Sequence, residues 1–568
     1  MSARSPSSPA LPAWDRFGLA AIALALVIGV AQAIRLFWTS DDAYISFRYA
    51  ENLIHGHGLV FNAGERVEGY SNFLWTVWCA VGMKLGAGPE TWTGVWGIAC
   101  YAASIALLGW LAARRAGPGA RFVPLAALLA AFHRDWSIFA TGGLETSMFT
   151  MLLLVSYALL AGPPPGAARL AAAGAAMGLV ALSRPDGILF AGLAGLFLLV
   201  EQRGLRHGVL VYAVALAALV VPYAAWKLSF YGDLRPNTYY AKSAAHAWYR
   251  QGAHYVFLYF RKYAVLLLAM PLATPALRAA GPDPAGRRRS VALAALFALG
   301  GTFYVMHVGG DFMFARFLIP VAPFYLILIE EGWSRIAGGR PRLHLAGALA
   351  MLVATAALPY PFRGEGWIHG IVNEHEFYTP ERRDLAERQG ETLRRATEGL
   401  PVRMAFAGSQ AALAFHSKVP LAIEAAAGLT DSFIAHQPLA ERGRVGHEKP
   451  APMDYVISRR RCHFLIGKSD LTTRALEPWI PVLSVKLSTL DLTLLTWDPP
   501  VMAEMRRRGA ECDDFLELLD AYIQVMPVLT DEEVKRDYPR FRRFYFDGVS
   551  DPAREAPFRR RLNDPNLR

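Results

Sequence analysis

The sequence predicts an all-α membrane domain of about eleven transmembrane helices, followed by a C-terminal α/β domain outside the membrane. Apolar residues make up 54% of the 568 positions and the mean hydropathy is +0.25, more than an ordinary soluble domain carries. Apolar runs of roughly 17 to 22 residues recur along the first 360 positions, and each can cross ~30 Å of hydrocarbon as a helix. After about Pro361 no further run of that length follows.

Each apolar run is predicted to be helical, because a helix closes its backbone hydrogen bonds within its own segment in lipid. The runs are 17–37, 91–112, 122–139, 144–162, 168–182, 187–201, 207–228, 258–279, 290–307, 316–332 and 343–360. A shorter run, 71–86, is predicted to lie in the membrane interface, which its Trp75, Trp78 and Lys84 suit. Counting it as a span would place every later basic loop on the outer side.

Basic residues collect in alternate loops and predict the orientation. In a bacterial inner membrane, Lys and Arg are enriched in short cytoplasmic loops. The basic loops contain Arg114, Arg115 and Arg121; Arg169; Arg203 and Arg206; Arg278 and Arg287 to Arg289; and Arg335, Arg340 and Arg342. We therefore expect a cytoplasmic N-terminus, a membrane domain over 1–360 and a periplasmic domain over 361–568.

The C-terminal region alternates helical and β-like patterns. Residues 380–399 predict a charged helix, whereas 402–408, 481–487 and 492–497 have the composition of short strands. An α/β domain is the expected result. Its cysteines, Cys462 and Cys512, lie in a compartment that permits oxidation, so they either form a disulfide or remain two buried thiols.

Several classes of function find no support in the sequence. The net charge is +11, but much of the basic excess lies in the predicted cytoplasmic loops, where anionic lipid headgroups are a simpler partner than nucleic acid. No Walker-type glycine loop, CxxC pair, HExxH or GxSxG motif occurs. Nucleotide hydrolysis, structural zinc and α/β-hydrolase chemistry are therefore not indicated.

Two adjacent aspartates, Asp41 and Asp42, directly follow the first predicted span. A carboxylate at the point where a membrane helix reaches water can act as the general base for a sugar hydroxyl, and a like-charged neighbour perturbs its protonation. Alternatively, the pair caps a helix that begins near Ala43. Ionisable groups at a membrane border are costly unless they are used or solvated, so both interpretations are kept.

The other predicted outer loops carry charges of both signs in the motifs GGLET, SRPDG, NTYYAKS and GGDFMFARF. We expect Arg184, Lys242 and Arg316 to bind a lipid phosphate, which needs cationic donors. The predicted substrate contacts among the carboxylates are Glu145, Asp186 and Asp311. The alternatives are a simple turn at 184–187 and a structural ion pair between Asp311 and Arg316.

Aromatic residues favour a carbohydrate substrate, because sugars stack their apolar faces on rings. Tyr44 and Tyr239 are predicted sugar contacts, although Tyr is also common at membrane interfaces. His57, in HGHGLVFN, either binds a substrate oxygen or a metal, or belongs to a Gly-rich turn.

The stretch DDAYISFRYAENLIHGHGLVFNAGERVEGYSNFLW, with GGLETSMF, LSRPDG, NTYYAKS and GGDFMFARFLIP after it, resembles the polytopic GT-C glycosyltransferases. In particular it resembles the mycobacterial terminal arabinofuranosyltransferase type, and residues 428–450 are similar to a segment of that type's C-terminal domain. The resemblance implies transfer of a sugar, arabinofuranose or another, from a polyprenyl-phosphate carrier to a glycan or lipid acceptor outside the membrane. It also implies that Asp41 or Asp42 acts at the reaction centre.

Acceptor contacts are expected within 428–450, at Asp431, Arg444, His447 and Glu448. A divalent metal, Mg²⁺ or Mn²⁺, can bridge the acidic pair to the donor phosphate, but no residue spacing demands one. Two other classes of function compete with the transferase. A lipid-linked sugar flippase would be expected to carry polar residues within its helices or an inverted repeat, and a membrane scaffold would not need the acidic pair.

Overall fold

The computed structural model describes residues 15–562, apart from 118–119, 203–205, 279–282, 339, 365 and 468–482, so the predicted loop residue Arg203 lies outside the described residues. The chain forms two compact units. The first, the helical unit, comprises Met1–Ser40, Ser71–Leu234 and His246–Tyr378. The second comprises Asp41–Tyr70, Arg235–Ala245 and Thr379–Arg568. The predicted boundary at 360 stays a prediction, since the compact units also group two earlier loops with the C-terminal part.

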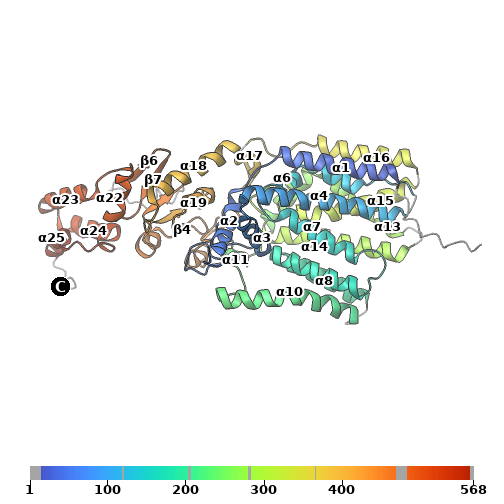
Figure 1. Cartoon of the computed structure of the whole chain (residues 1–568), viewed down its shortest axis with the longest axis horizontal. Coiled ribbons are helices and arrows are strands. Elements are labelled where there is room, and N and C mark those ends of the chain that lie inside the picture. The colour runs from blue at the N-terminus through green and yellow to red at the C-terminus, as the bar shows by residue number, and fades with distance from the viewer. Residues whose placement is uncertain are drawn as a thin grey trace, which may run out of the picture. The chain divides into compact units, whose positions relative to one another are not determined.

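The helical unit is built from the apolar runs of the sequence, and Figure 1 shows its longer helices running side by side. Its helices are α1 Arg16–Arg35, α3 Phe73–Lys84, α4 Pro89–Ala116, α5 Leu125–Ala131, α6 Arg134–Phe139, α7 Thr146–Leu160, α8 Ala167–Ser183, α9 Gly187–Glu201, α10 His207–Tyr231, α12 Tyr249–Lys262, η1 Ala264–Leu268, α13 Ala269–Arg278, α14 Pro284–Val308, η2 Ile319–Val321, α15 Ala322–Ala337, α16 Pro341–Ala357 and α17 Glu374–Phe377. The strands β1 Trp367–Ile368 and β2 Ile371–Val372 form a small antiparallel pair.

Among the described residues, four helices are long and apolar enough to cross a membrane, namely α1, α4, α10 and α14. A fifth span results if Tyr249–Lys262 and Ala264–Pro275, which meet at an angle of 96°, count as one bent pair. The shorter apolar helices are Phe73–Lys84, Thr146–Leu160, Ala167–Ser183, Gly187–Glu201 and Arg342–Ala357. The prediction of several apolar helices is confirmed, and the count of eleven spans stays a prediction.

The predicted span 122–139 is not a single helix, because polar residues interrupt it. His133 ends the first piece, and its Nδ1 accepts a backbone N–H at the start of α6 at 3.1 Å. Asp135 is 1% exposed and accepts hydrogen bonds from the hydroxyls of Tyr263 at 2.5 Å and Tyr360 at 2.6 Å. These side chains replace one long helix with α5 and α6.

The second unit contains a six-stranded sheet of order β4-β3-β5-β7-β6-β8. The edge pair β3–β4 and the next pair, β3–β5, are parallel, whereas β5–β7, β6–β7 and β6–β8 are antiparallel. The strands are β3 Arg403–Phe406, β4 Leu421–Glu424, β5 Phe464–Ile466, β6 Ser484–Leu487, β7 Leu490–Leu494 and β8 Glu511–Cys512. The helices are α2 Asp41–Ile54, α11 Asn237–Ala241, α18 Pro380–Thr397, α19 Ala411–Ser417, α20 Ser432–Ala435, η3 Tyr455–Arg459, α22 Pro499–Arg507, α23 Phe515–Val525, η4 Met526–Val528, α24 Asp531–Phe541, η5 Arg542–Phe546 and α25 Pro552–Leu562.

The sheet confirms the predicted C-terminal α/β pattern. The predicted helix 380–399 is α18, and the three predicted strand segments contain β3, β6 and most of β7. A buried apolar core that includes Ala405, Ile423 and Leu465 packs around β3, β4 and β5. Cys462 is buried and Cys512 is half-buried, and both are free thiols, which matches the alternative without a disulfide.

Candidate functional site

The predicted site residues are divided between the two units. Glu145, Arg184, Asp186, Asp311 and Arg316 belong to the helical unit. The second unit contains Asp41, Asp42, Tyr44, His57, Tyr239, Lys242, Asp431, Arg444, His447 and Glu448. Within each unit, the fold brings several of these side chains into contact.

Glu145 is the centre of the helical unit's group. It precedes α7, is 3% exposed, and accepts a hydrogen bond from Asn72 Nδ2 at 2.9 Å. Its Oε1 lies 3.3 Å from Nη1 of Arg184 and 3.5 Å from Nη2 of Arg316. Three segments that are far apart in the sequence therefore meet at one carboxylate.

Each of these arginines also pairs with a second carboxylate. Arg184 donates from Nε and Nη2 to the two carboxylate oxygens of Asp186, at 2.9 Å and 3.1 Å. Arg316 lies 3.5 Å from Oδ2 of Asp311, which is 3% exposed. We refer to Glu145, Arg184, Asp186, Asp311 and Arg316 as the charged cluster. All five members were predicted from the sequence, and the structure brings them together.

Local backbone and aromatic contacts hold Arg184 in place. It follows α8, and its carbonyl accepts the N–H of Gly187 at 3.0 Å, which closes a turn. Its guanidinium lies over the rings of Phe149 and Phe317, 5.2 Å and 4.7 Å from their centroids. Cation–π contact and bidentate pairing both suit the planar fork of arginine better than a lysine ammonium. The turn that the sequence offered as an alternative is thus also present.

The charged cluster contains three carboxylates and two guanidinium groups. Burial disfavours the ionised form of Glu145, and the guanidinium groups of Arg184 and Arg316 offset that cost by pairing with it. A donor phosphate that approaches Arg184 or Arg316 must compete with the carboxylates that already pair with that guanidinium group. The ion pair between Asp311 and Arg316 is observed, and the phosphate-binding role of both arginines stays a prediction.

Asp41 is the first residue of α2, and its carboxylate is directed into the second unit. Its Oδ1 accepts the backbone N–H of Ala412 and its Oδ2 accepts that of Ala411, each at 2.9 Å. These donors begin α19, so Asp41 satisfies N–H groups that a helix leaves without partners. The residue is 7% exposed, and burial raises the pKa of its carboxyl to about 7, although the two backbone hydrogen bonds act in the opposite direction.

One member of the acidic pair, Asp41, therefore does cap a helix, but this helix is not the one that follows the pair. Helix α2 begins at Asp41 rather than near Ala43, and Asp41 caps another helix, 370 residues further along the chain. Asp42 lies in the same first turn and is half-buried. Asp41 is only 7% exposed, so the half-buried Asp42 is the more accessible carboxylate of the two.

Two further residues of the first loop fix it to the same part of the chain, although neither is among the predicted site residues. Arg48 is 7% exposed and donates to the carbonyls of Ala414 at 3.0 Å and Val419 at 2.7 Å, at and beyond the end of α19. Asn62 accepts the N–H of Ala422 at 2.9 Å and donates to its carbonyl at 3.0 Å. Asn62 thus pairs with the edge strand β4 as a further strand would.

The 235–245 loop carries Tyr239 and Lys242. Nδ2 of Asn237 donates to the carbonyl of Gly428 at 2.8 Å and ties the loop to the 428–450 segment. The ring of Tyr239 lies below the guanidinium of Arg235, at 4.9 Å. Lys242 is half-buried, and its ammonium group makes no ion pair or hydrogen bond among the described residues. It differs in this respect from the two arginines of the charged cluster.

His57 lies in a turn that follows α2. Its backbone N–H donates to the carbonyl of Asn52 at 2.9 Å, and the flanking Gly56 and Gly58 have φ values of +83° and +84°. The exposed side chain, together with Lys418, lines a cavity of about 370 Å³. Among the described residues, no group of three or more His, Cys, Asp or Glu side chains is placed to hold a metal ion. A divalent metal that bridges the acidic pair to the donor phosphate stays a prediction.

Three other predicted contacts are buried within the second unit, where Tyr44 is 2%, Asp431 4% and Glu448 8% exposed. Asp431 accepts a backbone N–H at the start of α20 at 3.1 Å, and Glu448 pairs with the arginine six residues before it at 2.8 Å. Arg444 and His447 are half-buried and form an isolated β-bridge with each other. These contacts stabilise the 428–450 segment, and its role in acceptor binding stays a prediction.

Comparison with known proteins sets these features in context. No family model matches the chain. It is 32% identical over 332 residues to the terminal beta-(1->2)-arabinofuranosyltransferase of Mycobacterium tuberculosis, and 30% identical over 345 residues to that of Corynebacterium glutamicum. Each match covers 52% of this chain, and the chain spans about half the length of these curated relatives, 52% and 49%.

Two solved structures of ArnT from Cupriavidus metallidurans resemble the whole fold. The apo form superimposes with a TM-score of 0.52 over 84% of this chain and 97% of ArnT, and the form bound to undecaprenyl phosphate with 0.51 over 73% and 87%. The chain has the ArnT fold. The sequence identity to ArnT is only 15%, so the likeness concerns the fold. The resemblance to the terminal arabinofuranosyltransferase type inferred from the sequence is confirmed by the two sequence relatives.

Asp41 makes the stability of the folded protein depend on pH. Its pKa is about 7 in the fold and near 3.8 as a model carboxyl, so the folded state binds more protons between these values. The contribution of Asp41 to the free energy of unfolding is therefore complete below about pH 4 and falls as the pH rises through 7. We expect Asp41→Asn to remove this slope in urea unfolding of the full chain in detergent.

The control for this measurement is Asp42→Asn, which should keep most of the slope, because burial is the largest cause of the raised pKa of Asp41 and the charge of Asp42 contributes least. Burial also raises the pKa of Glu424, so the wild type and both variants share a residual slope from that residue. The informative quantity is the difference between the wild type and Asp41→Asn. Equal slopes in these two proteins would contradict the assignment.

Proposed function

We propose that this protein is a membrane glycosyltransferase that moves a sugar, with arabinofuranose the first candidate, from a polyprenyl-phosphate carrier to a glycan or lipid acceptor. The observation that carries the proposal is the combination of the ArnT fold with 32% sequence identity to an arabinofuranosyltransferase. One ArnT structure contains undecaprenyl phosphate, which is a polyprenyl phosphate. The arabinofuranose assignment follows the names of the sequence relatives.

The reaction exchanges one bond at the anomeric carbon for another. The bond from this carbon to the donor's phosphate oxygen breaks, and its electron pair leaves with the polyprenyl phosphate. The acceptor hydroxyl oxygen forms the new bond and gives its proton to a carboxylate. Positive charge develops on the sugar and negative charge on the phosphate, so the site needs an anion near the first and a cation near the second.

Asp42 is the carboxylate that we assign to the sugar and the acceptor proton. A general base must come within hydrogen-bond reach of the proton that it takes. The two oxygens of Asp41 are occupied by the N–H groups of α19, and only 7% of that residue is exposed. Asp41 is therefore a positioning residue, which holds the first turn of α2 beside α19.

Lys242 is the first candidate for the donor phosphate. Its ammonium group has no carboxylate partner among the described residues, whereas Arg184 and Arg316 each pair with two. A cation without such a partner binds phosphate without displacing an existing ion pair. Arg184 and Arg316 remain further candidates, and the 428–450 segment is the proposed acceptor contact.

The proposed topology has about eleven crossings, a cytoplasmic N-terminus and a periplasmic C-terminal domain. Helix α7 supports it, because Glu145 of the charged cluster immediately precedes its first residue. Just past its other end lies Gly162, which lines one cavity with Arg114, Arg115 and Arg287. The arginines of the predicted cytoplasmic loops and the charged cluster thus lie at opposite ends of this helix.

Asp42→Asn should abolish turnover while the protein stays folded. We expect kcat to fall by roughly 10²- to 10⁴-fold, as for the loss of a general base. The measurement is release of polyprenyl phosphate by the purified full chain from a panel of polyprenyl-phosphoryl sugars, with acceptor extract present. The panel also identifies the sugar.

Asp41→Asn is the matched variant in the same assay. It should lower kcat less than Asp42→Asn, because Asp41 holds the first turn of α2 and its two oxygens already accept the N–H groups of α19. Turnover that is indifferent to Asp42→Asn would refute its catalytic assignment. Absence of turnover with every donor would favour the flippase or the scaffold instead.

Lys242→Gln should weaken use of the donor. Loss of one charged contact to phosphate is worth about 1.5–3 kcal/mol, which corresponds to roughly a 10- to 100-fold lower kcat/KM for the donor. The control is Lys486→Gln, an exposed lysine on β6 of the same unit. Equal kcat/KM values for Lys242→Gln and the control would remove Lys242 from the phosphate site.

The topology predicts opposite results for two reporters fused to the C-terminal end of the chain. Alkaline phosphatase, which requires export for activity, should be active, and a fluorescent protein that folds only in the cytoplasm should be dark. The reverse pattern would show an even number of crossings and place the sheet-containing unit in the cytoplasm.

A further inference from the structure

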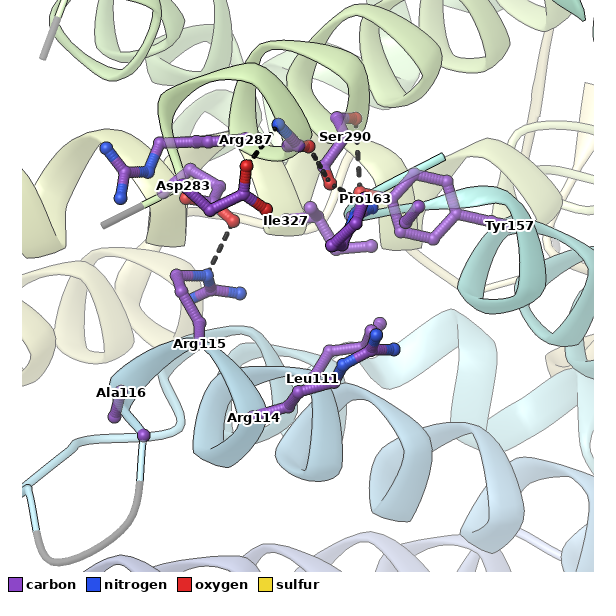
Figure 2. Close-up of a pocket in the computed structure, with 15 residues that line it drawn as sticks. Leu111, Arg114, Arg115, Ala116, Tyr157, Pro163, Asp283, Arg287, Ser290 and Ile327 are labelled. Atoms are coloured by element: carbon purple, nitrogen blue, oxygen red, sulfur yellow. Dashed lines mark hydrogen bonds and ion pairs between the residues drawn. The ribbon is translucent and has the colours of Figure 1, made fainter. Parts of the chain in front are cut away.

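The end of the helical unit that is opposite to the charged cluster holds two cavities lined by arginine. The first, of about 360 Å³, lies between the end of α4 and the start of α14. Figure 2 shows Arg114 and Arg115 on one wall of it, and Asp283 and Arg287 on the other. The second, of about 500 Å³, lies where α1 and α16 begin, beside residues 121–123.

The first cavity is largely neutralised by its own carboxylates. Arg115 lies 2.6 Å from Glu330 and 2.5 Å from Glu331, so its charge is matched before any ligand arrives. Asp283 adds a further negative charge to the wall, although its Oδ1 accepts the N–H of Gly286 at 2.8 Å. This cavity is a poor site for an anion.

The second cavity has the opposite balance. Arg121, Arg340 and Arg342 line it, and none of the three pairs with a carboxylate of the described residues. The one acidic residue of its wall, Asp15, uses Oδ2 to accept the N–H groups of Gly18 at 3.1 Å and of residue 122 at 3.4 Å. Asp15 thus joins the start of α1 to the 121–123 segment and leaves the three guanidinium groups without an anion.

The remaining walls of this cavity are apolar and open to the outside of the bundle. Phe122 and Val123 are buried behind it, whereas Phe17 and Leu345 are 52% and 51% exposed beside it. Nε2 of His344 is buried and has no hydrogen-bond partner among the described residues. A ligand for this cavity therefore combines an anionic head, able to accept from guanidinium and imidazole N–H groups, with an apolar tail.

We propose that the cavity between the start of α1, residues 121–123 and the start of α16 binds the phosphodiester headgroup of an anionic phospholipid. The planar guanidinium groups of Arg121, Arg340 and Arg342 match phosphate oxygens in pairs. The acyl chains lie along Phe17 and Leu345. Basic pockets between membrane helices are a recurring way of holding anionic lipid. The site lies at the other end of the helical unit from the charged cluster, so it is separate from Arg184 and Arg316.

The test compares two double variants with the same change of charge. Arg340→Gln/Arg342→Gln removes two cations from the proposed site, and Arg114→Gln/Arg287→Gln removes two from the cavity of Figure 2. Binding of dioleoylphosphatidylglycerol to the purified full chain is measured in mixed micelles of a neutral detergent, by native mass spectrometry and by the rise in thermal midpoint. Dioleoylphosphatidylcholine is the neutral reference lipid.

We expect the first double variant to bind phosphatidylglycerol roughly 25-fold more weakly than the wild type, since each arginine near an anionic lipid contributes about fivefold. The second variant should stay within about twofold of the wild type, because its cavity already contains carboxylates. Equal losses in both variants would show diffuse attraction to the basic end and overturn the site. Displacement of the lipid by millimolar inorganic phosphate would assign the cavity to free anions instead.

Discussion

Helix α2 supplies opposite charges to the two ends of α19, and this contact organises the second unit. The Asp41 carboxylate accepts two N–H groups at the start of α19, where the helix dipole is positive, and Arg48 donates to carbonyls at and beyond its end, where the dipole is negative. Both side chains are buried, so loss of either partner would leave a charge or several backbone groups unsatisfied in a dry environment. The position of Asp42, one residue on, follows from this arrangement.

The buried charged side chains of the two units are stabilised by different kinds of partner. In the charged cluster, Arg184 and Arg316 share Glu145, and each has a second carboxylate of its own. In the second unit, Asp41 is satisfied by backbone donors alone. Both arrangements fix a charged side chain firmly, which is what a transferase needs if its charges are to stabilise a transition state without reorganising.

Local patterns in the sequence were sufficient for much of the fold. Apolar runs predicted the helices, and short β-like runs predicted strands β3, β6 and β7. Burial of one face or of a whole segment selects apolar residues at regular positions, which makes such elements recognisable in a sequence. The charged cluster could be assembled from motifs, since buried charges need partners of opposite sign. The break between α5 and α6 was missed because the apolar character of 122–139 outweighed His133 and Asp135, whose partners lie in distant segments.

The cap formed by Asp41 was beyond sequence reasoning for another reason. An aspartate that follows a membrane helix is expected to cap the next helix in the sequence. Asp41 does cap a helix, but the capped helix is α19 and not the next one along the chain. Arg48 and Asn62 bond to backbone groups, which carry no side-chain signature at the far end of the contact. Such pairings become visible only in three dimensions.

The separation of 370 residues between Asp41 and Ala411 has a consequence for synthesis. At about 5–20 residues per second, a ribosome needs roughly 20–70 s to reach α19 after it has made the first loop. Throughout that interval the loop has neither the helix that Asp41 caps nor the strand edge that Asn62 covers. Its buried polar side chains must remain hydrated until α19 and β4 have been made, so the segment that bears the acidic pair is made early and acquires its native partners late.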